Sequence, residues 1–501
     1  MFPIPQKISE RLDNDQARMP FLESLNAEKA RRQISFHMPG HKMVLPPPDA
    51  LLEYWGGDLQ PADLVEISGM IDYLHAPRGA LKEAQELAAR AYGADHTFWL
   101  INGSTVGNIG AVMSVAGDGD VVIMARASHR SVYSGVVLSG AVPCYIPPDY
   151  HPRVGFPLAS DPKVVADLLA QHSQAVAVHV TSPNYYGYMS DTARLAALAH
   201  AQGAALLVDE AHGSHLGFHE DLPQSAARLG ADLVIQSTHK TQSALTQASM
   251  LQVNEGYVDV ARVAQVLAVL QSSSPSSILL ASLDAARMVM ATQGRALLDK
   301  ALNLAQEARE TIRQIDGMWC FGEDIVGEHG IFTYDPTKLV VRVIDTGWSG
   351  YQVFDKLRYE HGIDVESADL RTIICSITIG DTPQMVSKLL SGLQAIASEK
   401  PPQAQKAVEI DAPSELPTMA LTPRQAFFAR SRVLPAEAAV GQAVAEYLIP
   451  YPPGIPLVAP GEVLTRETLD YLRTIKAVGG KMVGPQDASL STIRCIDDRR
   501  R

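Results

Sequence analysis

A lysine that follows a Ser-x-His sequence carries the clearest chemical signal in this chain. Lys240 ends the segment Ser237-Thr238-His239-Lys240, which follows the apolar run 233–235. Its amine can hold the aldehyde of pyridoxal phosphate as a Schiff base. Asp209 ends an earlier apolar run and can keep the pyridine nitrogen of that cofactor protonated, so that the ring accepts electrons from a breaking bond. Taken singly, these are a surface lysine and a helix cap, but together they predict a cofactor site.

A phosphate group requires donors, and several positions can supply them. Ser104 and Thr105 follow an apolar run in the sequence Asn-Gly-Ser-Thr and open a helical pattern, where free backbone N–H groups bind anions. Ser237 and His239 can donate to the same phosphate. The alternative for Ser104 is a plain helix cap.

Two further histidines follow predicted strands. His129 comes after the run 121–124, and its ring can stack on a pyridine, although a hydrogen-bonding role in a loop is an open alternative. His212 lies three residues after Asp209 and can approach the ring or its oxygen substituent. A structural role for His212 is also open.

These residues need a scaffold that brings them together. Short apolar runs alternate with helical stretches from about residue 71 to 291, which is typical of a mostly parallel sheet wrapped by helices. The expected strands are 97–101, 121–124, 142–146, 175–180, 205–209 and 233–236, and two of the intervening helices are 104–115 and 191–200. In such sheets ligands bind outside the carboxyl ends of the strands, where Asp209 and Lys240 are expected.

Changes in composition along the sequence predict five segments. They are an N-terminal arm (1–60), a cofactor-binding large domain (61–291), a small α+β domain (292–398) with strands at 339–344 and 372–379, a proline-rich linker (399–421) and a C-terminal α+β domain (422–501). A chain of 501 residues is too long for a single core, in agreement with several domains.

Composition excludes several classes of protein. The chain has 42 Lys and Arg against 55 Asp and Glu, a formal charge of −13, and no basic cluster for nucleic acid. No apolar run approaches the roughly 20 residues that span a membrane, and no secretory signal is evident. The four cysteines are scattered without a CxxC pair, which predicts reduced thiols in the cytoplasm, and no metal site is expected.

Several motifs together resemble the Orn/Lys/Arg decarboxylase family of fold-type I pyridoxal phosphate enzymes. They are FHMPGHK (36–42), NGST (102–105), SHRS (128–131), VDEAHG (208–213), STHK (237–240) and YPPGIP (451–456). The resemblance implies an aspartate-aminotransferase-like α/β fold, with Lys240 as the Schiff-base lysine, Asp209 at the ring nitrogen and His129 stacked on the ring. It places Ser104, Thr105, Ala211, His212, Ser237 and His239 around the cofactor.

The resemblance also implies a shared active site. Ser273, in Ser-Ser-Pro-Ser-Ser, matches a hydroxyl residue that reaches the cofactor phosphate of a neighbouring subunit, so we expect a homodimer or a higher homo-oligomer. The family's usual tyrosine is Ser277 here, and its usual threonine in the first motif is Met38. These departures leave the aromatic contact at Ser277 in doubt but do not affect the lysine–aspartate pair.

The expected reaction is decarboxylation of a basic amino acid, and the shorter branch of the family favours arginine, giving agmatine for polyamine biosynthesis. Lysine and ornithine are the close alternatives. Carboxylates would bind the distal cation, and the candidates are Glu66, Asp72 and Glu446. An aminotransferase or aldolase on the same fold is the enzymatic alternative, and a non-catalytic regulator is the remaining one.

Overall fold

The computed structural model describes residues 15–31, 33–66, 69, 71–155, 159–402, 410–411, 413, 415–451 and 454–497. The chain forms two compact units. The first unit is drawn from 1–110 and 210–298, and the second from 111–209 and 299–501.

Three strands of the main sheet belong to the first unit. They are β1 (His96–Leu100), β8 (Ser249–Val253) and β7 (Leu233–Gln236), and β8 pairs antiparallel with both of the others. Helix α4 (Ala80–Tyr92) packs against β1 with an apolar face. Helix α5 (Gly103–Val115) begins directly after β1, so its N-terminus lies where that strand ends.

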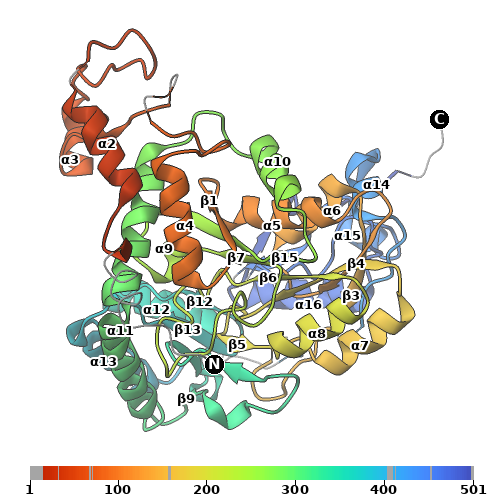
Figure 1. The fold of residues 1–501 in the computed structure, drawn as a ribbon. Helices are drawn as coiled ribbons and strands as arrows, with labels where there is room; N and C mark the ends of the chain where they lie inside the picture. The colour runs from red at the N-terminus through yellow and green to blue at the C-terminus, as the bar shows by residue number, and fades with distance from the viewer. Residues whose placement is uncertain are drawn as a thin grey trace. The chain divides into compact units, whose positions relative to one another are not determined.

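Four parallel strands belong to the second unit, in the order β6-β4-β2-β3. Their bounds are β6 (Ala205–Asp209), β4 (Ala175–Thr181), β2 (Val121–Ala125) and β3 (Val142–Ile146). Their continuous apolar runs suit strands that are covered on both faces. Helices α7 (Pro162–Gln171) and α8 (Thr192–Ala201) pack on each other and against these strands (Figure 1).

The second unit also holds a smaller antiparallel sheet in the order β12-β13-β11-β9. Helices α12 (Gly350–His361) and α13 (Pro383–Ser398) pack together, and α12 also contacts β12 and β13 (Figure 1). Two antiparallel pairs, β14 with β17 and β15 with β16, lie near the C-terminus, where α16 (Arg466–Ala477) contacts the second pair.

The bounds of these strands are β9 (Trp319–Cys320), β11 (Lys338–Arg342), β12 (Ser367–Ala368), β13 (Thr372–Ser376), β14 (Ser431–Pro435), β15 (Ile449–Tyr451), β16 (Lys481–Val483) and β17 (Thr492–Ile496). The other elements are α2 (Pro20–Ala30), α3 (Asp49–Trp55), η1 (Gln60–Ala62), α6 (Arg130–Ser139), β5 (Tyr188–Met189), α9 (Thr238–Thr241), α10 (Val260–Leu270), α11 (Ser277–Ile312), η2 (Glu323–Ile325), β10 (Thr333–Tyr334), η3 (Ile344–Thr346), α14 (Pro423–Phe428) and α15 (Ala436–Ala439).

The predicted α/β fold with a mostly parallel sheet is confirmed. Strands 142–146, 205–209 and 233–236 have the predicted bounds, whereas the strand expected to reach residue 379 ends at Ser376. Strand β8 was not predicted, and its pairing makes β1 antiparallel to it. The five predicted segments remain predictions.

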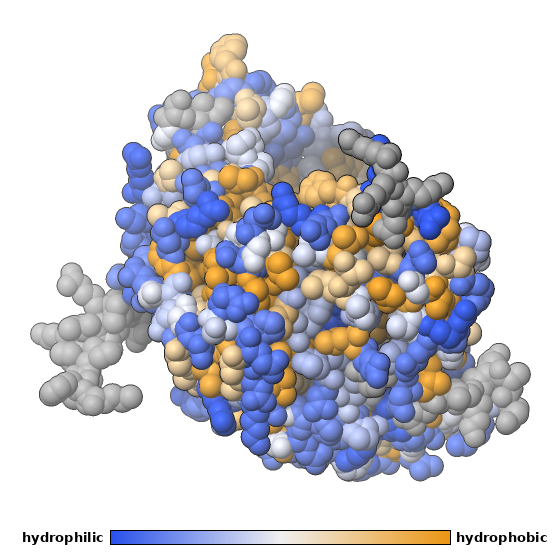
Figure 2. Space-filling model, turned by 90° about the vertical axis from the view of Figure 1, so that its right-hand side faces the viewer, coloured by the Kyte–Doolittle hydropathy of each residue, from blue (hydrophilic) through white to orange (hydrophobic). Residues whose placement is uncertain are grey.

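Among the described residues, no helix is long and apolar enough to cross a membrane. On the face that Figure 2 shows, apolar side chains lie in small groups between polar ones.

Candidate active site

The first unit brings two predicted site residues into contact. Lys240 lies in the short helix α9, directly after β7, and its Nζ is 3.1 Å from Nε2 of His212. His212 is buried, and Lys240 is half-buried. The contact means that His212 can exchange a proton with the lysine amine.

Buried hydroxyl groups flank this lysine. The side chains of Ser237 and Thr238 are fully buried, and within the described part of the chain neither hydroxyl has a hydrogen-bond partner. An unpaired buried hydroxyl costs stability unless a ligand satisfies it. Ser237 is therefore suited to bind an anionic group, and its contact with the cofactor phosphate stays a prediction. The ring of His239 is held through Nδ1, which contacts the carbonyl oxygen of Ala248 at 3.0 Å.

The N-terminus of α5 carries the other predicted phosphate donors. Gly103 donates from its backbone to the carbonyl of Gln247 at 2.9 Å, which fixes the entry into the helix. Ser104 is half-buried and Thr105 is exposed in the first turn. The first N–H groups of a helix lack intrahelical acceptors and carry the positive end of its dipole, so this turn suits a phosphate.

Asp209 ends β6 in the second unit and is buried. In the parallel ladder it lies opposite Thr181, the last residue of β4. Burial lowers the pKa of the neighbouring His179 to about 4, although the charge of Asp209 opposes this shift, so His179 is neutral near pH 7. Sequence reasoning missed Thr181 and His179, and the only signal was polar residues within the apolar run 175–181.

Glu210 follows Asp209 and lies in a buried polar network of the first unit. Its carboxylate accepts hydrogen bonds from the Ala226 backbone (2.7 Å), the Ser225 hydroxyl (2.8 Å) and the Gln236 side chain (2.6 Å). Burial raises the pKa of Glu210 to about 7, although these donors act to lower it. The network fixes the start of the segment that carries His212, and sequence reasoning did not identify it.

Three other predicted cofactor residues have different surroundings. His129 caps α6, and its Nδ1 contacts the hydroxyl of Ser131 at 2.7 Å, which orients the ring. Ala211 is buried beside His212. Ser273 is exposed.

A small pocket lies at the carboxyl ends of the parallel strands in the second unit. Its lining includes Ala127 after β2, Asp149 after β3, and Thr181 and Asn184 at the end of β4. Ligands of open α/β sheets bind at this edge. Arg126 also lines the pocket, but its guanidinium is paired with the buried Glu462 at 2.5 Å.

The three predicted substrate carboxylates bind backbone N–H groups. Asp72 accepts from the first turn of α4, including Gly79 at 2.7 Å, and so neutralises a helix N-terminus. Glu66 accepts from the backbone N–H groups of Gly69 and Ile71. Glu446 accepts from Gln486 at 2.7 Å and Arg494 at 2.8 Å. Contact of these three carboxylates with the substrate stays a prediction.

An aminotransferase would need an arginine to grip the substrate carboxylate, and three candidate arginines of this chain are each paired with a carboxylate of the protein. Arg287 is fully buried and paired with Asp284 at 2.6 Å. Arg342 is paired with Asp345 at 2.7 Å, and Arg371 contacts Asp411 at 2.6 Å.

Two family models match the chain. One describes the major domain of Orn/Lys/Arg decarboxylases and matches residues 19–385, and the other describes their C-terminal domain and matches residues 406–487. The chain is 40% identical over 480 residues to the arginine decarboxylase of Bacillus anthracis, covering 96% of this chain and 97% of that protein. It is 38% identical over 483 residues to the arginine decarboxylase of Bacillus subtilis, covering 96% and 98%.

Solved structures with the same fold include lysine decarboxylases. The Francisella novicida enzyme LdcF superposes with a TM-score of 0.81 at 21% identity, covering 96% of this chain and 82% of that chain. The constitutive lysine decarboxylase of Escherichia coli superposes with a TM-score of 0.80 at 22% identity, covering 98% and 83%.

Proposed function

Because the chain belongs to the Orn/Lys/Arg decarboxylase family, we propose that it converts L-arginine to agmatine and carbon dioxide. Arginine is the proposed substrate because the arginine decarboxylases of Bacillus anthracis and Bacillus subtilis are 38–40% identical to this chain over nearly its whole length. A lysine decarboxylase of Pseudomonas aeruginosa is 27% identical. In this proposal the reaction contributes to polyamine biosynthesis.

Pyridoxal phosphate is the proposed cofactor, and the contact between Lys240 and His212 is the observation that carries this proposal. The buried hydroxyl of Ser237, which has no partner within the described residues, fits a phosphate oxygen. We propose that Lys240 forms the covalent bond to the cofactor, that Asp209 binds its ring nitrogen and that His129 stacks on its ring. The residues proposed to bind the cofactor phosphate are Ser104, Thr105, Ser237 and His239. Ala211 is proposed to lie beside the ring.

The side chains have distinct tasks in this assignment. When bound, the cofactor supplies an electron sink for the bond that breaks at Cα of the substrate. Asp209 holds the proton on the ring nitrogen, because a buried carboxylate stabilises a nearby positive charge. His212 moves a proton to or from Nζ of Lys240 across their 3.1 Å contact. The bond that breaks is chosen by how the site orients the substrate.

The active enzyme is proposed to be a cytoplasmic homodimer or higher homo-oligomer. The support is the exposed position of Ser273, which matches the family segment that reaches a neighbouring phosphate. The free, scattered cysteines support a reducing compartment.

Product analysis tests the proposed reaction. The purified protein is loaded with pyridoxal phosphate and incubated separately with arginine, lysine and ornithine. We expect agmatine and carbon dioxide in equal amounts from arginine, and much less product from the other two. Cadaverine or putrescine as the main product would refute arginine as the substrate but would leave decarboxylation as the reaction. Keto acid without carbon dioxide would overturn decarboxylation.

A further inference from the structure

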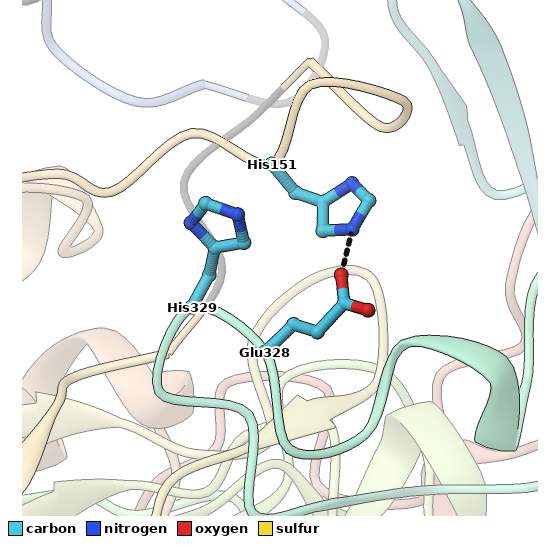
Figure 3. A group of neighbouring side chains, drawn as sticks. All are labelled: His151, Glu328 and His329. Carbon is cyan, nitrogen blue, oxygen red and sulfur yellow. Dashed lines mark hydrogen bonds and ion pairs between the residues drawn. The ribbon is translucent and has the colours of Figure 1, made fainter.

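A cluster of two histidines and a glutamate lies away from the lysine site. His151 follows β3, and Glu328 and His329 lie in the loop between η2 and β10, all in the second unit. One ligand atom from each residue lies within 4.8 Å of the other two. Figure 3 shows both imidazole rings beside the Glu328 carboxylate, with a ring nitrogen of His329 directed toward His151.

The backbone around the cluster is fixed before any ligand binds. The loop closes through two hydrogen bonds, Gly327 N to Ile331 O and Ile331 N to Glu328 O, both at 2.9 Å. On the other side, Val154 donates to the carbonyl of His151 at 3.1 Å. Ile331 and Val154 are buried in the same apolar cluster. Because both loops are anchored, binding a ligand requires little ordering of the chain.

His329 is oriented as metal-binding histidines are. Its Nδ1 contacts the carboxylate of Asp149 at 2.9 Å, which leaves Nε2 as the nitrogen available for an ion. A carboxylate behind the imidazole fixes the tautomer and raises the basicity of the ligating nitrogen. With two neutral histidines, the Glu328 and Asp149 carboxylates would balance a divalent charge.

Binding a metal ion at His151 costs free energy, because a hydrogen bond of this ring must break. Its Nε2 lies 2.8 Å from Glu328, and its Nδ1 accepts from the Arg153 backbone at 3.2 Å, so the neutral ring carries its proton on Nε2. A metal ion on Nε2 moves that proton to Nδ1 and breaks the long hydrogen bond from Arg153. Glu328 must also rotate inward, which is feasible because its side chain is 57% exposed.

We propose that His151, Glu328 and His329 bind a divalent transition metal of the zinc class, with water completing the coordination. Imidazole nitrogen and a single carboxylate suit Zn²⁺ better than Mg²⁺, which prefers oxygen ligands. The ion would join the loop after β3 to the loop before β10. Asp149, which orients His329, also lines the pocket at the carboxyl ends of the parallel strands, so the metal would stiffen that edge. This proposal does not depend on the substrate of the enzyme.

Calorimetric titration of the untagged holoenzyme with zinc chloride, after dialysis against a chelator, tests the site. We expect one Zn²⁺ per chain, with no competition from excess Mg²⁺. His329→Ala and Glu328→Gln should each weaken binding at least tenfold, with thermal midpoints in chelator unchanged. His96→Ala is the matched control, because His96 contacts Glu255 at 2.7 Å in a pair that belongs to no described three-residue cluster.

Failure of the wild-type protein to bind one Zn²⁺ per chain would overturn the site. Equal binding by wild type and by both cluster variants would overturn it as well. If one variant does not fold, the other still decides, since each removes a different ligand.

Discussion

At the scale of single residues, the proposed chemistry depends on the contact between Lys240 and His212. The two atoms lie 3.1 Å apart, within reach of direct proton transfer. We expect His212→Ala to lower kcat about 10²-fold or more, while the cofactor stays bound to Lys240. The measurement is kcat on arginine together with the absorbance of the bound cofactor. His96→Ala, at an exposed pair, should leave kcat unchanged, and an unchanged kcat in His212→Ala would refute the role.

Glu210 should make stability depend on pH. Its folded pKa of about 7 is above the ordinary value of 4.5, so the folded protein binds this proton more tightly than the unfolded chain. The stabilisation is therefore complete below about pH 4.5 and is lost as pH rises through about 7. We expect the stability advantage of wild type over Glu210→Gln to shrink by up to about 3 kcal/mol across that window. Thermal midpoints of the two holoproteins, measured side by side, give this difference.

His179 provides the opposite slope as an internal control. Its folded pKa of about 4 lies below the ordinary 6.5, so its contribution is present above about 6.5 and is lost as pH falls through about 4. The advantage of wild type over His179→Gln should therefore shrink toward acid. Parallel pH profiles for the two variants would contradict at least one of the two assignments.

At the scale of elements, α5 must approach the sheet closely to present Ser104 and Thr105. A Cβ at Gly107 would lie 2.8 Å from Ile235 Cγ2 and 2.8 Å from Leu100 Cδ1. Ile235 is β-branched and lies in β7, so it has little freedom to move. We expect Gly107→Ala to cost about 1–3 kcal/mol and to weaken phosphate binding by displacing the helix. Thermal midpoints and titration with pyridoxal phosphate measure the two effects.

Gly110→Ala is the matched control on the same helix. A Cβ at Gly110 would lie 3.0 Å from Cδ2 of Leu267, which is at the end of a flexible side chain. The control should lose less stability and keep its affinity for the cofactor. Equal losses of stability and of cofactor affinity in the two variants would show that the contacts at Gly107 constrain α5 no more than those at Gly110.

Local apolar runs were sufficient to predict most of the sheet, because parallel strands covered on both faces are continuously apolar. Strand β8 was missed because Gln252 lies within it and pairs through its side chain with Gln236 and Thr97. The sequence placed Lys240 and Asp209, the residues proposed to anchor the cofactor and to bind its ring nitrogen, at strand ends, and both lie there in the structure. Glu210, Thr181 and His179 were not predicted, because their importance lies in burial and in neighbours distant in sequence.

At the scale of the whole molecule, the proposed sharing of active sites between subunits has a direct test. If Ser273 acts on the partner's phosphate, Ser273→Ala weakens cofactor binding, and Lys240→Ala removes the anchor. A mixed dimer of these two variants restores one complete site, because the Lys240→Ala chain supplies Ser273 to the other chain. We expect activity of the mixture to exceed that of either variant alone at limiting cofactor. Activity no higher than that of Ser273→Ala would contradict sharing.

Long-range architecture was less accessible from the sequence than the site. The cluster of His151, Glu328 and His329 joins residues 177 positions apart, and no local spacing signals it. The roles of Asp72 and Glu446 in holding backbone N–H groups were equally hidden, since a carboxylate in a sequence does not reveal its donors.

Borohydride reduction followed by peptide mapping tests the central claim most directly. Reduction of the protein loaded with pyridoxal phosphate fixes the cofactor to the lysine that holds it. The account predicts a single modified peptide that contains Lys240, and none in Lys240→Ala. A cofactor fixed to another lysine, such as Lys42 in the FHMPGHK segment, or the absence of any modified peptide, would contradict it.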